Sequence, residues 1–96
     1  MAAYVVVDTK ISDPQAYEEY KALARPLAEK HGGVYLARGG AMDVVEDELW
    51  RPSRIVLLRF LDMRSARAFV DSDAYAPVKA IRHANAECTM VIVEGL

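Results

Sequence analysis

The sequence predicts an α+β fold in which strands and helices follow one another in the order β-α-β-β-α-β. Three observations support this prediction. Short runs of β-branched and aromatic residues indicate strands, and stretches with apolar residues at three- and four-residue spacing indicate helices. Glycine, proline and capping residues separate these segments. The length of 96 residues fits a single domain that spans residues 1–96.

A strand and a long helix are predicted at the start of the chain. Residues 3–11, "AYVVVDTKI", form a short segment rich in valine, which is typical of a strand. Asp13 then offers an N-cap, and Pro14 suits the first helical turn. The helix that follows has an apolar stripe made by Tyr17, Tyr20, Ala24 and Leu27. Pro26 predicts a kink near the end of this helix, because proline leaves the carbonyl of Ala22 without its hydrogen bond.

Two pairs of glycines flank the next strand, "VYLAR" (residues 34–38), within the stretch "HGGVYLARGG". The first pair follows the cationic residues Lys30 and His31, where Gly32 suits the left-handed end of a helix. A phosphate-binding loop requires glycines between a strand and the start of a helix. Neither pair has that order, so the glycines are architectural. The pair at residues 39–40 predicts a bulge or bend within a strand.

A long hairpin is predicted over residues 34–60, with its turn near Asp47. Its first arm continues from "VYLAR" through "AMDVVEDELW", and its second arm is "RIVLLRF" (residues 54–60). Asp62 is expected to cap a second helix, whose inward residues are Ala66, Phe69 and Val70. Ser72 and Asp73 precede a further short helix with Tyr75, Val78 and Ile81 on one side. "CTMVIVEG" (residues 88–95) is the last predicted strand.

Right-handed crossovers between these elements give a ferredoxin-like, four-stranded antiparallel sheet with the helices on one face. Three strands carry apolar residues on both faces, in "YVVV", "IVLL" and "MVIV". About eight apolar side chains would therefore stay in water, at ~1.5–3 kcal/mol each. We accordingly expect a homodimer, formed through the exposed sheet face about a two-fold axis.

Composition excludes several classes of function. A net charge of −2 with intermixed charges gives no electrostatic footprint for a nucleic acid. No apolar run approaches the ~20 residues of a membrane span, and the first residues lack the pattern of a signal peptide. Cys88 is the single cysteine, and His31 and His83 lack metal-ligand spacing. We therefore expect a cytoplasmic protein with no metal, no cofactor and no membrane partner.

Four separated segments, "HGGVYLARGG", "RPSRIVLLRF", "DSDAYAPVKAIRHA" and "VIVEG", resemble the bacterial family known as domain of unknown function 1330 (DUF1330). The resemblance runs from about Tyr4 to Gly95. It implies a dimeric α+β barrel, in which two ferredoxin-like sheets close face to face, and it implies no activity. Two departures stand out: the hairpin tip is "EDEL" where the family has a Glu-Gly pair, and Arg59 stands where the family strand often has an acid. The resemblance therefore implies no chemistry here that needs this acid.

Two arginines are candidate ligand-binding residues. By strand alternation Arg38 shares a face with Val34 and Leu36, and its guanidinium suits a carboxylate or an enolate. The alternative is an ion pair with a carboxylate of a helix or of the partner. Arg59 is expected on the dimer-facing surface, opposite to Phe60, where a salt bridge to Asp8 or Glu94 is favoured over ligand binding.

Four further residues complete the candidate site. Tyr75 and Arg82 lie two helical turns apart and would face one pocket edge, where a tyrosine hydroxyl can donate to an oxyanion; a half-buried structural tyrosine is the alternative. Trp50 would cover a pocket or anchor the dimer interface. His31 would pass protons or simply cap its helix.

Three functions therefore stay open. The first is a cofactor-free enzyme that acts on a small organic acid, ketone or lactone. The second is a binding module for such a molecule, without turnover. The third is a structural dimer whose arginines are all paired internally.

Overall fold

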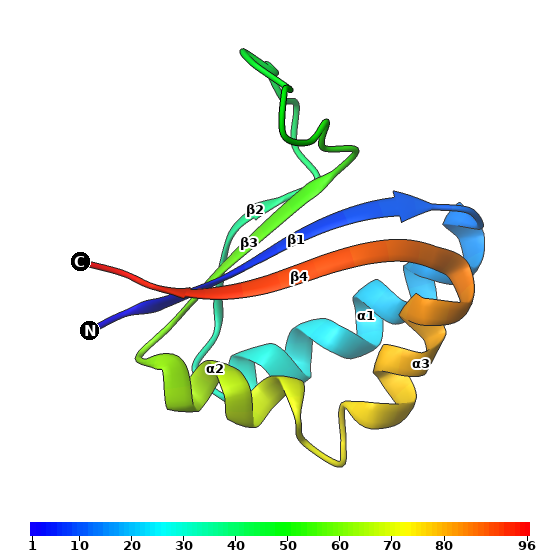
Figure 1. The fold of residues 1–96 in the computed structure, drawn as a ribbon. Helices are drawn as coiled ribbons and strands as arrows, with labels where there is room; N and C mark the ends of the chain where they lie inside the picture. Colours follow the sequence, from blue (N-terminus) through cyan, green and yellow to red (C-terminus); the bar gives the residue numbers. More distant parts are fainter.

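The computed structural model describes residues 1–96 and has the predicted α+β, ferredoxin-like architecture. A four-stranded antiparallel sheet in the order β2-β3-β1-β4 is covered on one face by helices (Figure 1). The elements are β1 (Ala3–Ile11), α1 (Pro14–Lys30), β2 (Val34–Arg38), β3 (Ile55–Phe60), α2 (Met63–Val70), α3 (Ala76–Asn85) and β4 (Ala86–Glu94). No helix has the length and apolar character needed to cross a membrane.

The central strand β1 has two different faces. Val5 pairs with Leu58 of β3 and Ile92 of β4, and these side chains join the core beneath the helices. Val6 pairs with Leu57 and Val91, whose side chains point to the opposite surface because strand side chains alternate. We call this opposite surface the open face. Its larger apolar members are Tyr4, Val6, Val34, Ile55, Leu57, Val91 and Val93.

Local chemistry fixes both ends of α1, as the sequence predicts. The Asp13 side chain accepts a hydrogen bond from the backbone of Ala16 at 3.1 Å. At the other end Gly32 has a φ of +84°, and the N–H of Gly33 donates to the carbonyl of Ala28 at 2.8 Å. This is the Schellman arrangement for which a left-handed glycine is preferred. The helix continues past Pro26 to Lys30.

Gly33 also lets the chain pass close to the core. An alanine Cβ here would lie 2.8 Å from the carbonyl oxygen of Ala28 and 2.8 Å from Cζ of Phe60. We expect Gly33→Ala to lower the free energy of unfolding by about 1–3 kcal/mol, as overpacked sites do. Denaturant unfolding measures the change, with Gly40→Ala as control because no atom lies within 4 Å of that Cβ. Equal effects of the two substitutions would contradict the expectation.

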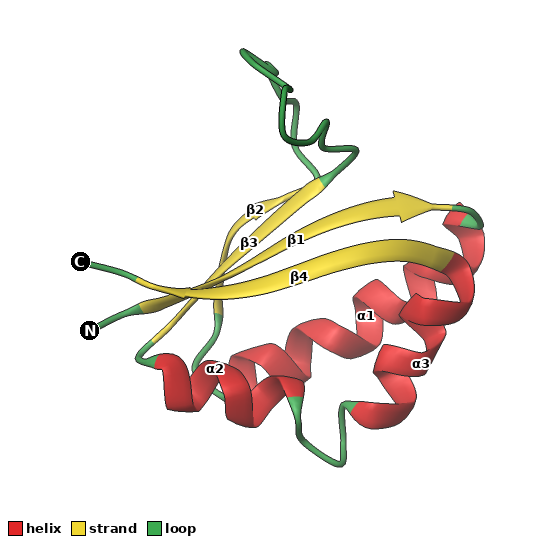
Figure 2. Ribbon diagram, in the orientation of Figure 1, coloured by secondary structure: helices red, strands yellow, loops and turns green.

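The long predicted hairpin is wrong in its middle part. β2 ends at Arg38, and residues 39–54 form an irregular loop instead of strand arms that meet near Asp47. The loop projects beyond the sheet, away from the helices (Figure 2). Val45 is 86% exposed and Leu49 is fully exposed. Strand propensity acts through packing against cross-strand neighbours, and here the apolar residues of "AMDVVEDELW" have none.

The chain bends at Gly39, within the glycine pair where a bulge or bend is predicted, and a separate bulge lies before it at Leu36. Tyr35 pairs with Leu58 and Ala37 with Leu57, so Leu36 is the extra residue. Gly39, with a φ of +70°, ends the strand. Because the bulge resets the alternation, Arg38 shares the helix-covered face with Tyr35. The predicted common face of Arg38, Val34 and Leu36 is therefore wrong.

The second half of the chain follows the prediction more closely. Asp62 caps α2, accepting from the backbone of Ser65 at 2.8 Å, and the expected inward residues Ala66, Phe69 and Val70 are buried. Ser72 rather than Asp73 makes the side-chain hydrogen bond before α3, to the N–H of Tyr75 at 3.2 Å. The last strand begins at Ala86, two residues earlier than predicted.

Candidate functional site

A small cavity lies between α1 and the helix-covered face of the sheet. We call it the α1–sheet cavity; its volume is about 30 Å³. The sheet supplies apolar walls together with Tyr35 and Arg38, and α1 supplies Tyr17, Tyr20 and Lys21. The lining residues are Val5, Val7, Tyr17, Tyr20, Lys21, Tyr35, Arg38, Arg54, Val56, Leu58, Phe69, Tyr75 and Met90. The three cationic residues are half-buried whereas Tyr75 is 0% exposed, so the cavity opens to solvent beside the charges.

A pair of tyrosine hydroxyls lies at the cavity. The hydroxyl oxygens of Tyr20 and Tyr75 are 2.6 Å apart, and the ring of Tyr75 packs against Phe69 at a centroid distance of 4.5 Å. Burial raises the pKa of both hydroxyls. Both groups therefore stay protonated at neutral pH. One hydroxyl donates to the other, and the proton of the second remains free for a bound oxygen atom.

Arg38 lies at the same cavity without an ion pair. Its guanidinium carbon lies 4.6 Å from the ring centroid of Tyr35, and Nη2 donates to the carbonyl of Lys21 at 2.7 Å. None of the four ion pairs in the chain involves Arg38. The alternative interpretation, an ion pair to a carboxylate of a helix, is therefore not formed. Its Nε and Nη1 atoms have no hydrogen-bond partner in the chain.

Arg54 is a lining residue that sequence reasoning missed. The prediction placed it as the first residue of a strand, but β3 begins at Ile55. Its guanidinium carbon lies 5.7 Å from the ring centroid of Tyr17 and makes no ion pair. A Cβ at Gly39 would lie 2.5 Å from Nε of Arg54, so the glycine gives this side chain its room. Arg38 on Tyr35 and Arg54 on Tyr17 thus form two arginine–tyrosine contacts beside the opening of the α1–sheet cavity.

Arg82 lies near this group but does not line the cavity. It is 4% exposed, and its Nε and Nη1 atoms have no hydrogen-bond partner. Nη2 contacts Nε2 of His83 at 3.2 Å, and the guanidinium carbon lies 6.0 Å from the ring centroid of Tyr20. Tyr75 lines the α1–sheet cavity and Arg82 does not, so the two residues do not share an edge of this cavity.

The predicted salt bridge of Arg59 is not formed. Arg59 is exposed on the open face, as expected, but it pairs in register with Tyr4. Glu94 pairs with Ala3, which faces the helices, so the two side chains lie on opposite sides of the sheet. Asp8 has other partners. Its carboxylate accepts hydrogen bonds from Nε1 of Trp50 at 2.6 Å and from two backbone N–H groups of the loop.

Trp50 and His31 lie away from the α1–sheet cavity. Trp50 lies over the open face beside Val6 and Val91, so it does not cover this cavity. His31 contacts the carbonyl of Leu27 through Nδ1 at 2.9 Å, which satisfies one of the last carbonyls of α1. No three histidine, cysteine, aspartate or glutamate residues form a group that suits a metal ion.

Asp8 connects the projecting loop to the sheet. Burial tends to raise the pKa of its carboxyl, but hydrogen bonds from Arg54, Trp50 and Ser53 outweigh this effect and hold the pKa below the ordinary 3.8. The ionised carboxyl of Asp8 therefore stabilises the folded chain fully above pH 3.8. This stabilisation is lost as the pH falls through the lower pKa that Asp8 has in the folded state.

The single tryptophan reports on this contact. We expect acidification below about pH 4 to change the fluorescence of Trp50, because the protonated carboxyl of Asp8 accepts weaker hydrogen bonds. In Asp8→Asn this acid transition should be absent. Asp47→Asn is the matched control, since Asp47 pairs with Arg51 in the same loop and does not contact Trp50. An unchanged transition in Asp8→Asn would show that another group causes it.

Comparison with protein families identifies the chain. Residues 2–96 match the model of the family described as "Domain of unknown function (DUF1330)". The chain therefore belongs to this family, as the sequence motifs indicate. No curated protein matches the sequence.

Solved structures show the same fold at low sequence identity. A protein of unknown function from Rhodopseudomonas palustris, RPA0582, is 12% identical with a TM-score of 0.76, covering 99% of this chain and 82% of the other. The cofactor-independent oxygenase SnoaB from Streptomyces nogalater is 11% identical with a TM-score of 0.73, covering 99% and 93%. A dimeric ferredoxin-like protein of unknown function from Jannaschia sp. is 17% identical with a TM-score of 0.72, covering 99% and 100%.

Proposed function

We propose that this member of the DUF1330 family binds a small organic acid at the α1–sheet cavity. One observation carries the proposal: Arg38, which has no acidic partner, and the hydroxyls of Tyr20 and Tyr75 lie at the same cavity. A guanidinium grips a carboxylate with two donors. A hydroxyl with a raised pKa is a hydrogen-bond donor and not a base. The guanidinium of Arg38 and the two tyrosine hydroxyls together suit a ligand with a carboxylate next to a carbonyl or enolate oxygen.

The size of the cavity limits how such a molecule binds. Its volume of about 30 Å³ exceeds the ~10–15 Å³ that one water molecule requires, and is far below the ~300 Å³ of a typical ligand pocket. The carbonyl end would enter between the tyrosines. The carboxylate would stay at the opening, between Arg38 and Arg54, where Lys21 adds a third positive charge.

The chemistry that these residues offer is stabilisation of negative charge. A free hydroxyl proton from the tyrosine pair would stabilise an oxyanion as an enolate forms, which favours an enzyme without cofactor acting on an acid, ketone or lactone. SnoaB is named as a cofactor-independent oxygenase, and fold alone does not transfer that activity. Binding without turnover uses the same contacts.

Calorimetric titration with small 2-oxo acids tests the proposal. We expect saturable binding that Arg38→Gln weakens at least about tenfold, because one charge-assisted hydrogen-bond pair is lost. Arg51→Gln is the control: it removes the same charge from the projecting loop and should bind like the wild type. Failure of every 2-oxo acid to bind, or equal losses in both variants, would overturn the proposal. Depletion of a bound acid over hours separates an enzyme from a binding module.

We also propose that two copies associate through the open face. Seven large apolar side chains lie there, and Val91 is 51% exposed in the single chain. A contiguous apolar surface of this kind is typical of an interface. The Jannaschia neighbour is described as dimeric, which supports the association of two copies. The helices, on the other side of the sheet, would stay accessible to ligands.

A further inference from the structure

Arg59 is a cation on the open face that has no partner in its own chain. It is exposed, forms no ion pair and stacks on no aromatic ring. Its register neighbours on this face are Tyr4 and Val34, and neither carries a charge. A guanidinium that is enclosed in an interface without an acid is costly. Two copies that cover Arg59 therefore associate well only if the partner supplies an acid there.

A recess at the other end of the open face suits a guanidinium. We call it the Trp50 recess; its volume is about 300 Å³, and its lining residues are Val6, Asp8, Trp50, Thr89 and Val91. The carboxylate of Asp8 is the one charged group of this lining, and it is ionised at neutral pH. The apolar walls suit the stem of an arginine, and the indole ring and the carboxylate suit its guanidinium.

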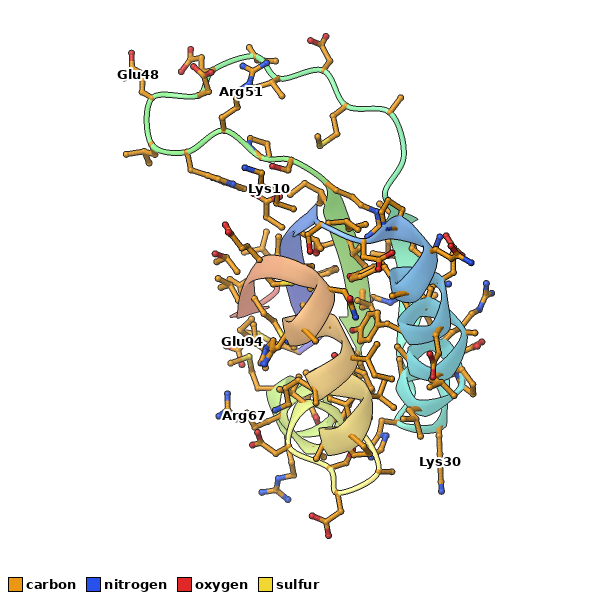
Figure 3. The ribbon with its side chains drawn as sticks, turned by 90° about the vertical axis from the view of Figure 1, so that its right-hand side faces the viewer. Lys10, Lys30, Glu48, Arg51, Arg67 and Glu94 are labelled. Carbon is orange, nitrogen blue, oxygen red and sulfur yellow. The ribbon has the colours of Figure 1, made fainter.

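Arg59 and Asp8 cannot meet within one chain. Arg59 lies level with Tyr4, and Asp8 is four residues further along β1. At ~3.3 Å per residue, the two levels are about 13 Å apart along the sheet. Figure 3 shows Lys10, two residues beyond Asp8, at the end of the sheet next to the projecting loop. The distance explains why the salt bridge is absent from the single chain.

A two-fold axis brings these two charges together between copies. A row of apolar residues on neighbouring strands lies midway between the levels of Tyr4 and Asp8, and its members are Leu57, Val6 and Val91. An axis along this row, across the strands, exchanges the two ends of the open face. It places the level of Arg59 in each copy over the level of Asp8 in the other. The open face has one further acid, Glu87, whose register neighbour is Lys10.

We infer that Arg59 of each copy enters the Trp50 recess of its partner and pairs there with the partner's Asp8. The inference rests on the proposed association through the open face, and it assigns the contact that sets the register of the two sheets. Oδ2 of Asp8 accepts one hydrogen bond, from Trp50, and keeps an acceptor position for a guanidinium. The same hydrogen bond holds the indole ring where it forms a wall of the recess.

Sedimentation equilibrium of the full-length protein tests the inference through the dissociation constant of the dimer. We expect Arg59→Gln to raise this constant at least about tenfold, because two charge-assisted contacts are lost and two carboxylates stay unpaired. Arg59→Lys keeps the charge and should raise the constant less. Arg64→Gln is the matched control and should dimerise like the wild type. Arg64 is also exposed and without an ion pair, but it lies on α2, on the other side of the sheet.

A double-mutant cycle shows whether Arg59 and Asp8 act on each other. Asp8→Asn should also raise the dissociation constant, and the double variant Asp8→Asn/Arg59→Gln should raise it by less than the product of the two single effects. Residues this far apart in one chain normally contribute independently, so coupling indicates contact between copies. Circular dichroism checks that Asp8→Asn is folded. If it is not, Arg59→Glu, which sets two acids against each other, must raise the constant further than Arg59→Gln.

The outcomes separate this inference from the proposed dimer. A wild-type protein that is monomeric at micromolar concentration would overturn both. A dimer that Val91→Asp dissociates but Arg59→Gln leaves unchanged would overturn this inference alone. An equal loss in Arg64→Gln, or single effects that simply multiply in the double variant, would do the same.

Discussion

Val91→Asp is expected to convert the proposed dimer into monomers. Val91 lies opposite Val6 near the middle of the open face. A two-fold axis would place both copies of the new carboxylate in one interface, with no cation of the same strand beside them. Each buried, unpaired charge costs several kcal/mol. A loss of at least about 4 kcal/mol raises the dissociation constant about a thousandfold.

Sedimentation at micromolar concentration measures this effect. Val91 is half-exposed in the single chain, so the variant should keep the circular dichroism of the wild type. Leu23→Asp provides the matched control, because Leu23 is an exposed leucine on α1, away from the open face. A wild-type protein that sediments as a monomer would refute the dimer, and a dimeric Val91→Asp variant would place the interface elsewhere.

The ends of the helices could be predicted because they depend on neighbouring residues. Asp13 caps α1 through a hydrogen bond to a residue three positions away. Gly32 ends the same helix because its own backbone adopts a positive φ. Such signals are complete within a few residues of sequence, and no tertiary contact was needed to interpret them.

The face of Arg38 could not be predicted, because a single extra residue decides it. Strict alternation places Arg38 with Val34, and the bulge at Leu36 moves it to the side of Tyr35. Leucine carries no turn signal, whereas the adjacent glycine pair does, so a bulge or bend was expected only at the glycines. The prediction that Arg38 contacts a ligand stays open, and the structure puts Arg38 at the α1–sheet cavity.

The hydroxyl pair at the cavity is also beyond sequence reasoning. Tyr20 and Tyr75 are 55 positions apart, and their contact depends on how α1 packs beside α3. Spacing on α1 correctly marked Tyr20 as part of an inward stripe. Nothing in that spacing distinguishes an aromatic residue that only fills the core from one whose hydroxyl meets another polar group.

Tyr75→Phe is expected to separate the structural and the ligand-binding roles of this residue. The ring stays in place against Phe69, but the hydroxyl of Tyr20 loses its partner at 2.6 Å. The free energy of unfolding should fall by about 1–2 kcal/mol, the usual result when a buried hydroxyl is left unpaired. Tyr75→Ala, which also removes the buried ring, should lower it by about 3–5 kcal/mol.

Affinity for 2-oxo acids should fall by about tenfold in the double variant Tyr20→Phe/Tyr75→Phe, since no hydroxyl of the pair is left to donate to the bound carbonyl oxygen while Arg38 still holds the carboxylate. Tyr35→Phe is the matched control: Tyr35 also lines the cavity and stacks with Arg38, but its hydroxyl makes no hydrogen bond in the chain. Denaturant unfolding and calorimetric titration of the same samples give both quantities. A double variant that loses stability but binds as the wild type would show that the hydroxyl pair only supports the core, and the organic acid would then be held by the arginines alone.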